Sequence, residues 1–195
     1  MIRLLLVVVS LMLGTAGALA CEEYKSLSTD EMKDYRDKLV EQDADPLDQL
    51  FAFEGLACSD SPAVRSYAMR AALEASADPI VRNRVVLEAL LQRSRIDMEV
   101  AVTAETSQDD KEFIKARGGV FSYEVRFVSQ DQGCLSLNQY DECDPDYALF
   151  IRGATVDIST PNDGLQGQLQ LTHANELVGY VTRGRGKIAA VIKLF

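Results

Sequence analysis

The pattern of apolar and polar positions divides the chain into two parts with different periods. From residue 28 to residue 95, apolar side chains recur three and four positions apart, as at Met32, Tyr35 and Leu39. That spacing is typical of amphipathic helices. Farther along, in the segment LQGQLQLT, Leu165 and Leu169 alternate with glutamines, as in a strand with one buried and one wet face. The pattern predicts a helical first half and a strand-rich second half.

Four helix starts are marked in the first half. Ser28 and Glu31 have the spacing of a capping box, in which each residue satisfies a backbone N–H of the other. The other three starts pair a capping residue with proline at the first helical position, at Asp45-Pro46, Ser61-Pro62 and Asp78-Pro79. Because the connections between them are short, we expect an antiparallel array of four helices.

The second half reads as strands joined by short turns. A strand is expected at 98–104 and a short helix at 108–117, and further strands are expected at 120–128, 147–158, 165–172, 177–182 and 187–195. Short turns imply an antiparallel meander, and one polar face implies that helices do not cover both sides. The predicted fold is α+β: a helical region at 21–97 followed by a β-rich domain at 98–195, either a β-sandwich or a partly open barrel.

Two of the helix starts are similar to each other. The segment SPAVRSYAMRAAL at 61–73 aligns with DPIVRNRVVLEAL at 78–90 and shares its Pro, Val, Arg, Ala and Leu positions. Over about residues 45–95 the chain resembles HEAT-like helical repeats. The resemblance implies a stack that presents a surface to another macromolecule. It makes Arg65 and Arg82 candidate contact residues; the other interpretation of these arginines is a solvated helix face.

The N-terminal segment reads as a targeting signal. Residues 1–20 carry Arg3, an apolar run at 4–13 and small residues that end at Ala20, as in a secretory signal peptide. An apolar run of ten residues is shorter than the roughly 20 that a membrane-spanning helix needs. We therefore expect a periplasmic or secreted protein. The alternative is a lipoprotein anchored through Cys21, the only case in which we expect membrane attachment.

The chain has four cysteines, at positions 21, 58, 134 and 143, and these allow three pairings. In an exported protein we expect two structural disulfides. Cys134 and Cys143 enclose eight residues, which suits a local bridge and would leave Cys21 for Cys58. The sequence alone leaves the pairing open. Lipidation of Cys21 would leave an odd set of thiols, so the cysteine count favours the unmodified form.

Charge and composition exclude several classes of function. The chain has 30 acidic and 20 basic residues and a formal net charge of -10, which opposes binding to nucleic acid. A single histidine, His173, excludes sites built from several histidines, and we assign it no catalytic role. The acidic segment at 138–146 lacks the spacing of a calcium-binding EF-hand and reads as a stiff loop. We predict no metal and no cofactor.

The remaining candidates point to binding rather than catalysis. Arg183 and Arg185 flank Gly184 in a basic turn, a candidate contact for a partner or an anion, or simply a soluble hairpin tip. No phosphate-binding loop, nucleophile elbow, zinc motif or dinucleotide fingerprint is present in the sequence. We predict a non-enzymatic binding or scaffolding module of the bacterial envelope with a protein partner. The alternative is a carboxylate-dependent hydrolase acting on an envelope polymer, because paired acids leave no sequence signature.

Overall fold

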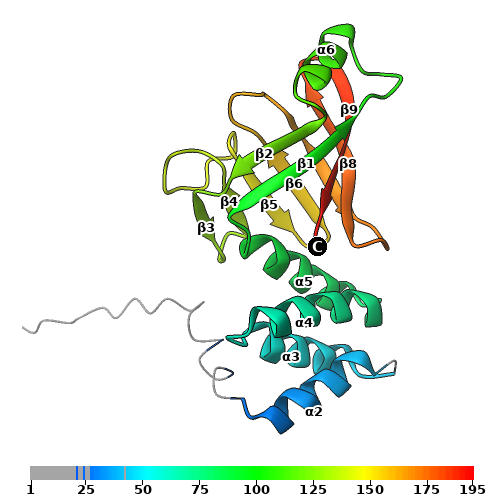
Figure 1. Cartoon of the computed structure of the whole chain (residues 1–195), viewed down its shortest axis with the longest axis vertical. Helices are drawn as coiled ribbons and strands as arrows, with labels where there is room; N and C mark the ends of the chain where they lie inside the picture. The colour runs from blue at the N-terminus through cyan, green and yellow to red at the C-terminus, as the bar shows by residue number, and fades with distance from the viewer. Residues whose placement is uncertain (1–20, 22–23, 25–26, 42) are drawn as a thin grey trace, which may run out of the picture.

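The first half of the chain is a stack of helices, as the sequence predicts. The computed structural model describes residues 21, 24, 27–41 and 43–195, so the predicted signal segment lies outside the described residues. The helices are α2 (Thr29–Val40), α3 (Pro46–Ala57), α4 (Pro62–Ala75) and α5 (Pro79–Leu91). Figure 1 shows them layered one above another beneath the β-sheet. All four predicted helix starts are confirmed.

The helix starts differ in how they are capped. Glu31 donates its backbone N–H to the Ser28 hydroxyl and its carboxylate accepts the Ser28 N–H, which completes the predicted capping box. The Asp78 carboxylate accepts the Ile80 N–H at 2.8 Å. Ser61, by contrast, makes no side-chain cap bond at the start of α4. Helix α4 therefore begins on Pro62 without the side-chain bond that Asp78 supplies to α5.

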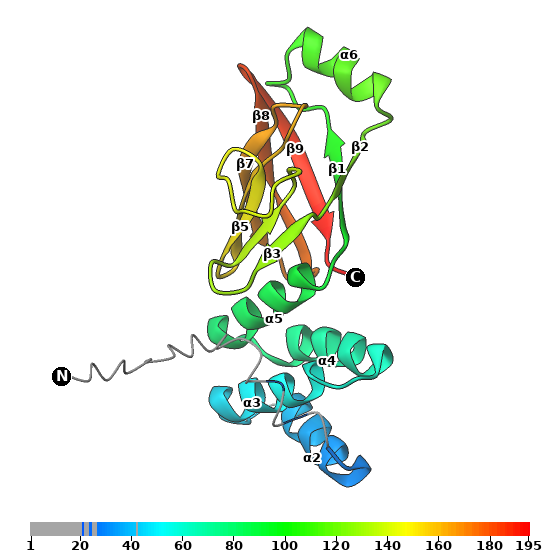
Figure 2. The same ribbon diagram turned by 90° about the vertical axis from the view of Figure 1, so that its left-hand side faces the viewer.

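The second half is one antiparallel sheet of nine strands among the described residues, in the order β2-β1-β9-β8-β7-β6-β5-β4-β3. The sheet curls into an open barrel, the second of the two predicted β architectures (Figures 1 and 2). Its core is filled by buried aliphatic side chains from the inner face. The strands are β1 (Arg95–Ala101), β2 (Val120–Glu124), β3 (Phe127–Ser129), β4 (Cys134–Ser136), β5 (Ala148–Arg152), β6 (Thr155–Ser159), β7 (Gln166–Leu171), β8 (Glu176–Arg183) and β9 (Gly186–Lys193).

Two predicted strands are wrong, and a third strand was not predicted. The expected strand at 120–128 is two strands, β2 and β3, which form opposite edges of the sheet. The expected strand at 147–158 is the β5–β6 hairpin, which turns at Gly153 with a φ of 67° that glycine adopts without strain. Strand β4 has only three residues, too few to show a period. The first strand also begins at Arg95, ahead of the expected 98.

Strands β7 and β8 approach each other closely in the middle of the curled sheet. In β7 the predicted alternation holds, since Leu169 is fully buried and Gln168 is exposed. Gly167 of β7 and Gly179 of β8 have no room for a side chain: a Cβ there would collide with the backbone carbonyls of Tyr180 and Gln168. Glycine at these positions allows the strong local bend of a barrel wall.

The stack and the barrel meet through α5. This helix contacts β4 and β5, and the Arg82 guanidinium joins the two parts by donating to the carbonyls of Leu73 and Thr172 at 2.8 and 3.1 Å. Arg70 of α4 lies over the ring of Phe195 at 5.6 Å. Helix α6 (Gln108–Ala116) lies at the opposite end of the barrel (Figure 2).

Candidate functional site

The structure contains the two disulfides that the sequence suggests. Cys21 is bonded to Cys58, and Cys134 is bonded to Cys143. Disulfides persist in oxidising compartments, so both bridges indicate an extracytoplasmic protein. A lipid thioether would need the same Cys21 sulfur, so the bridge and the lipid anchor exclude each other. None of the helices in the described residues has the length and apolar character needed to cross a bilayer.

The four arginines proposed as partner contacts lie in two separate places. Arg65 donates to the Ser59 carbonyl at 2.6 Å, and Arg82 joins the stack to the barrel. At the other end of the molecule Arg183 lies 4.1 Å from the ring centre of Phe113 in α6, while Arg185 is exposed in the neighbouring turn. The first three are engaged in internal contacts. Partner binding by these arginines stays a prediction.

The remaining sequence candidates do not form a metal site. His173 is exposed in the turn between β7 and β8. Within the described ranges, no three His, Cys, Asp or Glu side chains gather closely enough to hold a metal ion. The acidic segment at 138–146 lies in the loop between β4 and β5 that the Cys134–Cys143 bridge closes.

Two pairs of carboxylates bear on the hydrolase alternative. Asp97 and Glu124 line a hollow beside β1 and β2, and each pairs with an arginine, Arg95 and Arg126 respectively. The hydrogen bond from Ser122, helped by Arg95, lowers the pKa of Asp97. Asp97 is therefore ionised at neutral pH and unsuited to donate a proton to a leaving group.

In the second pair, both carboxylates form ion pairs with the guanidinium of Arg84. Arg84 contacts Glu54 at 3.0 Å and Glu88 at 3.4 Å. Burial raises the pKa of Glu88, and Glu54 adds to the rise while Arg84 opposes it. The hollow between α5 and the barrel is lined by Arg84 but by neither carboxylate. This pair joins α3 to α5 and does not converge on that cleft.

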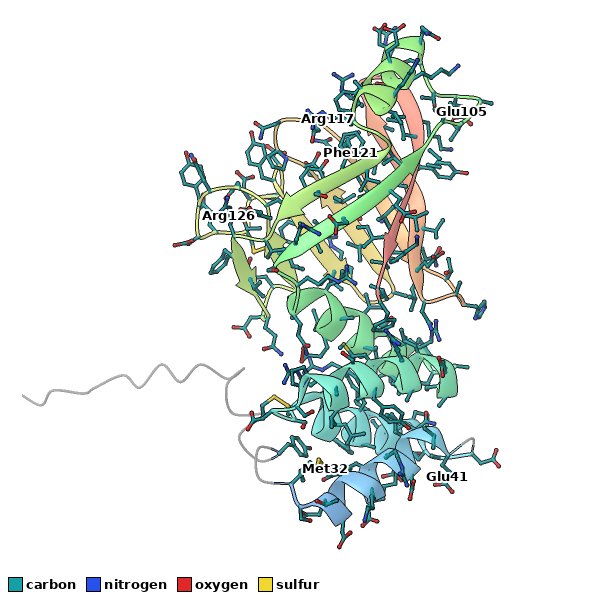
Figure 3. The ribbon with its side chains drawn as sticks, viewed as in Figure 1. Met32, Glu41, Glu105, Arg117, Phe121 and Arg126 are labelled. Carbon is teal, nitrogen blue, oxygen red and sulfur yellow. A yellow bond between two sulfur atoms is a disulfide. The ribbon has the colours of Figure 1, made fainter. Side chains whose placement is uncertain are left out.

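An elongated hollow with apolar side chains along both walls lies between α2 and α4 and is here called the α2–α4 groove. On α2, Met32, Arg36 and Val40 follow one another at four-residue spacing. On α4, Ala63, Tyr67, Ala71 and Ala75 do the same and form the facing wall. Residues four apart lie on one face of a helix, so the two stripes run along the groove. Met32, labelled in Figure 3, lies on the side of α2 turned toward the stack.

Tyr67 divides the groove into two hollows of about 350 and 650 Å³ that share Ala63 and Tyr67. The buried Leu56 of α3 forms part of the floor. Val40 and Tyr67 keep 42% and 45% of their surface exposed, which is high for large apolar side chains. The groove thus combines a buried floor with partly exposed apolar side chains in its walls.

The groove is basic although the protein is acidic. Its lining contains Lys33, Arg36 and Arg70 and a single acid, Glu74. Lys33 and Arg36 pair with Asp30 and Asp37 just outside the lining, in exposed pairs that contribute little and exchange easily. Sequence reasoning missed the groove because the spacing of each stripe is visible but the facing of α2 to α4 is not.

Fold and bridges together define an extracytoplasmic α+β protein, a helical stack joined to an open antiparallel barrel. The particular family stays open, because no family model, curated protein or solved structure matches the chain.

Proposed function

We propose that the protein is an exported, non-enzymatic binding protein of the bacterial envelope, and that the α2–α4 groove holds an acidic, amphipathic helix of a partner protein. The observation that carries the proposal is the pair of mostly apolar stripes, one on α2 and one on α4, that line the groove around Tyr67. Export rests on the signal-like segment at 1–20 together with the two disulfides.

The shape of the groove suits a helix. Helix α2 has 12 residues, so at about 1.5 Å per residue the groove extends for about 18 Å, or roughly three turns. A partner helix would place apolar side chains at four-residue spacing in the hollows on either side of Tyr67. The small side chains of Ala63 and Ala71 let its backbone approach α4 closely.

The charged side chains of the groove indicate which charge a partner helix should carry. Three basic side chains against one acid line the groove and favour a helix whose polar edges carry Asp or Glu, which would take the place of Asp30 and Asp37 as partners of Lys33 and Arg36. Within a Debye length of about 8 Å a basic partner would be repelled by these three side chains, whereas the net charge of -10 acts on it at longer range. The HEAT-like resemblance over about residues 45–95 includes α4, one wall of the groove, and also implies a helical binding surface.

Site-specific photocrosslinking in exporting cells tests the proposal. A benzophenone side chain is placed at Ser66, which is exposed in the groove, and at Ile80, an exposed apolar position on α5 outside it. We expect one discrete adduct from position 66 and none from position 80, with the crosslinked peptide helical, apolar on one face and acidic at its edges. A basic or non-helical captured segment, or equal adducts from both positions, contradicts the proposal.

Intact-mass measurement of the mature protein tests the location. We expect a chain that begins at Cys21 and is lighter by four hydrogens than the fully reduced form, as two disulfides require. A diacylglycerol adduct on Cys21 would instead show the lipid-anchored form.

A further inference from the structure

A second apolar surface of the helical stack lies on α3 and is here called the α3 ridge. Leu47 and Phe51 are four residues apart, so they lie on one face of the helix. Their exposed fractions are 53% and 51%, which are high for large apolar side chains. Asp45, which caps the helix, and Asp48 complete the ridge, and both are exposed. The groove and the ridge account for four of the five large apolar side chains that are exposed on α2 to α5 in the described structure.

The α3 ridge has the properties that the proposed function requires of a helix in the groove. Its two exposed apolar side chains have four-residue spacing, and Asp45 and Asp48 lie beside them. Residues 41–57 contain five acids and no Lys or Arg. Of these acids, only Glu54 forms an ion pair within the described part of the chain. The ridge is therefore acidic where the lining of the groove is basic.

The ridge and the groove face different sides of the stack. Leu56 of α3 forms part of the floor of the groove. At 3.6 residues per turn, Leu56 lies about 140° around the helix from Phe51 and about 180° from Leu47. The ridge thus points away from the groove of its own molecule. A ridge that enters the groove must belong to another copy of the chain.

We propose that the α2–α4 groove of one copy of this chain receives the α3 ridge of a second copy. The inference rests on the proposed function and names its partner. Leu47 and Phe51 of the second copy enter the hollows on either side of Tyr67. Its aspartates then lie beside the basic side chains of the groove. Because the groove and the ridge are different surfaces, the contact is head-to-tail and builds rings or open chains of copies.

The net charge sets the strength of this contact. Two copies that each carry a net charge of -10 repel each other at long range. At physiological ionic strength the Debye length is about 8 Å, so repulsion between distant charges is largely screened. The opposite charges of ridge and groove meet within that distance. We therefore expect weak, concentration-dependent association at physiological salt.

Analytical ultracentrifugation of the full mature, disulfide-bonded protein tests the inference from micromolar to millimolar concentration. We expect the average mass of the wild type to rise with concentration. Phe51→Glu places a charge on the ridge and Tyr67→Glu places one in the groove, so each should weaken association at least tenfold. Tyr180→Glu alters a ring of similar exposure on β8 and should associate as the wild type does. A wild type that stays monomeric, or single variants that associate as tightly as the wild type, overturns the inference.

An equimolar mixture of Phe51→Glu and Tyr67→Glu tests whether the contact joins ridge to groove. The first variant keeps an intact groove and the second keeps an intact ridge, so the mixture should form a dimer with one copy of each and nothing larger. Circular dichroism that matches the wild type establishes first that both variants are folded. A mixture of folded variants that associates no better than either variant alone contradicts the head-to-tail contact.

The crosslink from position 66 separates a failure of this inference from a failure of the proposed function. We expect the captured peptide to come from residues 45–57 of a second copy. An acidic helix of another protein at this position, together with a monomeric wild type, overturns the inference and leaves the proposed function standing. A basic or non-helical segment overturns both.

Discussion

Glu88 shows how a single buried carboxyl group sets a pH dependence of stability. Only 15% of its side chain is exposed, and its partner Arg84 also serves Glu54. Burial raises the pKa of Glu88 from its ordinary value of 4.5. The folded protein therefore holds this proton more tightly than the unfolded chain, and Glu88 weakens the fold as the pH rises from 4.5 through the raised pKa.

Glu88→Gln tests this sign. The amide keeps the shape of the side chain and does not ionise, while Arg84 retains Glu54. We expect the free energy of unfolding of the variant, relative to that of the wild type, to increase as the pH rises from 4.5 to 7. Urea denaturation at the two pH values measures the difference, with the exposed Glu142→Gln as the control. A wild type whose free energy of unfolding increases relative to that of the variant over this range would contradict this explanation.

At the scale of elements, the sequence marks where the helices start. Proline after a capping residue places the starts of α3, α4 and α5, and the structure adds which caps form a side-chain bond. Asp78 accepts two backbone N–H groups at the start of α5, whereas Ser61 accepts none at the start of α4.

A matched pair of substitutions follows from this contrast. Asp78→Ala should cost about 1 kcal/mol of unfolding free energy because α5 loses its cap. Ser61→Ala should cost less than about 0.5 kcal/mol because no cap bond is lost. Chemical denaturation of both variants checks the difference. Equal costs would mean that the cap bond of Asp78 contributes nothing to the fold.

How far the sequence predicts an element depends on whether its signal is local. Caps and the 3.6-residue period lie within a few positions, so every helix in the described stack was predicted. The break between β2 and β3 lies at Val125 and Arg126, neither of which is a typical turn residue. At this point the chain passes from one edge of the curled sheet to the opposite edge. The groove also depends on long-range packing, because Tyr67 of α4 lines the same hollow as residues of α2. No local pattern reports such contacts.

At the scale of the whole molecule, the two disulfides constrain different lengths of chain. The Cys21–Cys58 bridge spans 37 residues and ties the segment before α2 to the end of α3. The Cys134–Cys143 bridge spans only 9 residues and fixes a single loop. A longer closed loop restricts the unfolded chain more strongly.

The two bridges should therefore differ in their contribution to stability. In the chain-entropy model, removing the first by Cys21→Ala with Cys58→Ala costs about 4 kcal/mol, and removing the second by Cys134→Ala with Cys143→Ala costs about 3 kcal/mol. Guanidinium denaturation of the two double variants checks the order. A larger loss from the local bridge would show that loop length does not govern its effect.

The central claim is that the groove around Tyr67 binds an acidic amphipathic helix. Its most direct test is the affinity of the peptide captured from position 66, measured by titration calorimetry against three forms of the protein. Tyr67→Glu places a charge between the two hollows and should weaken binding at least tenfold, about 1.4 kcal/mol. Ile80→Glu adds the same charge on α5 and should leave the affinity within twofold of the wild type. Equal affinity of the wild type and Tyr67→Glu would contradict the claim.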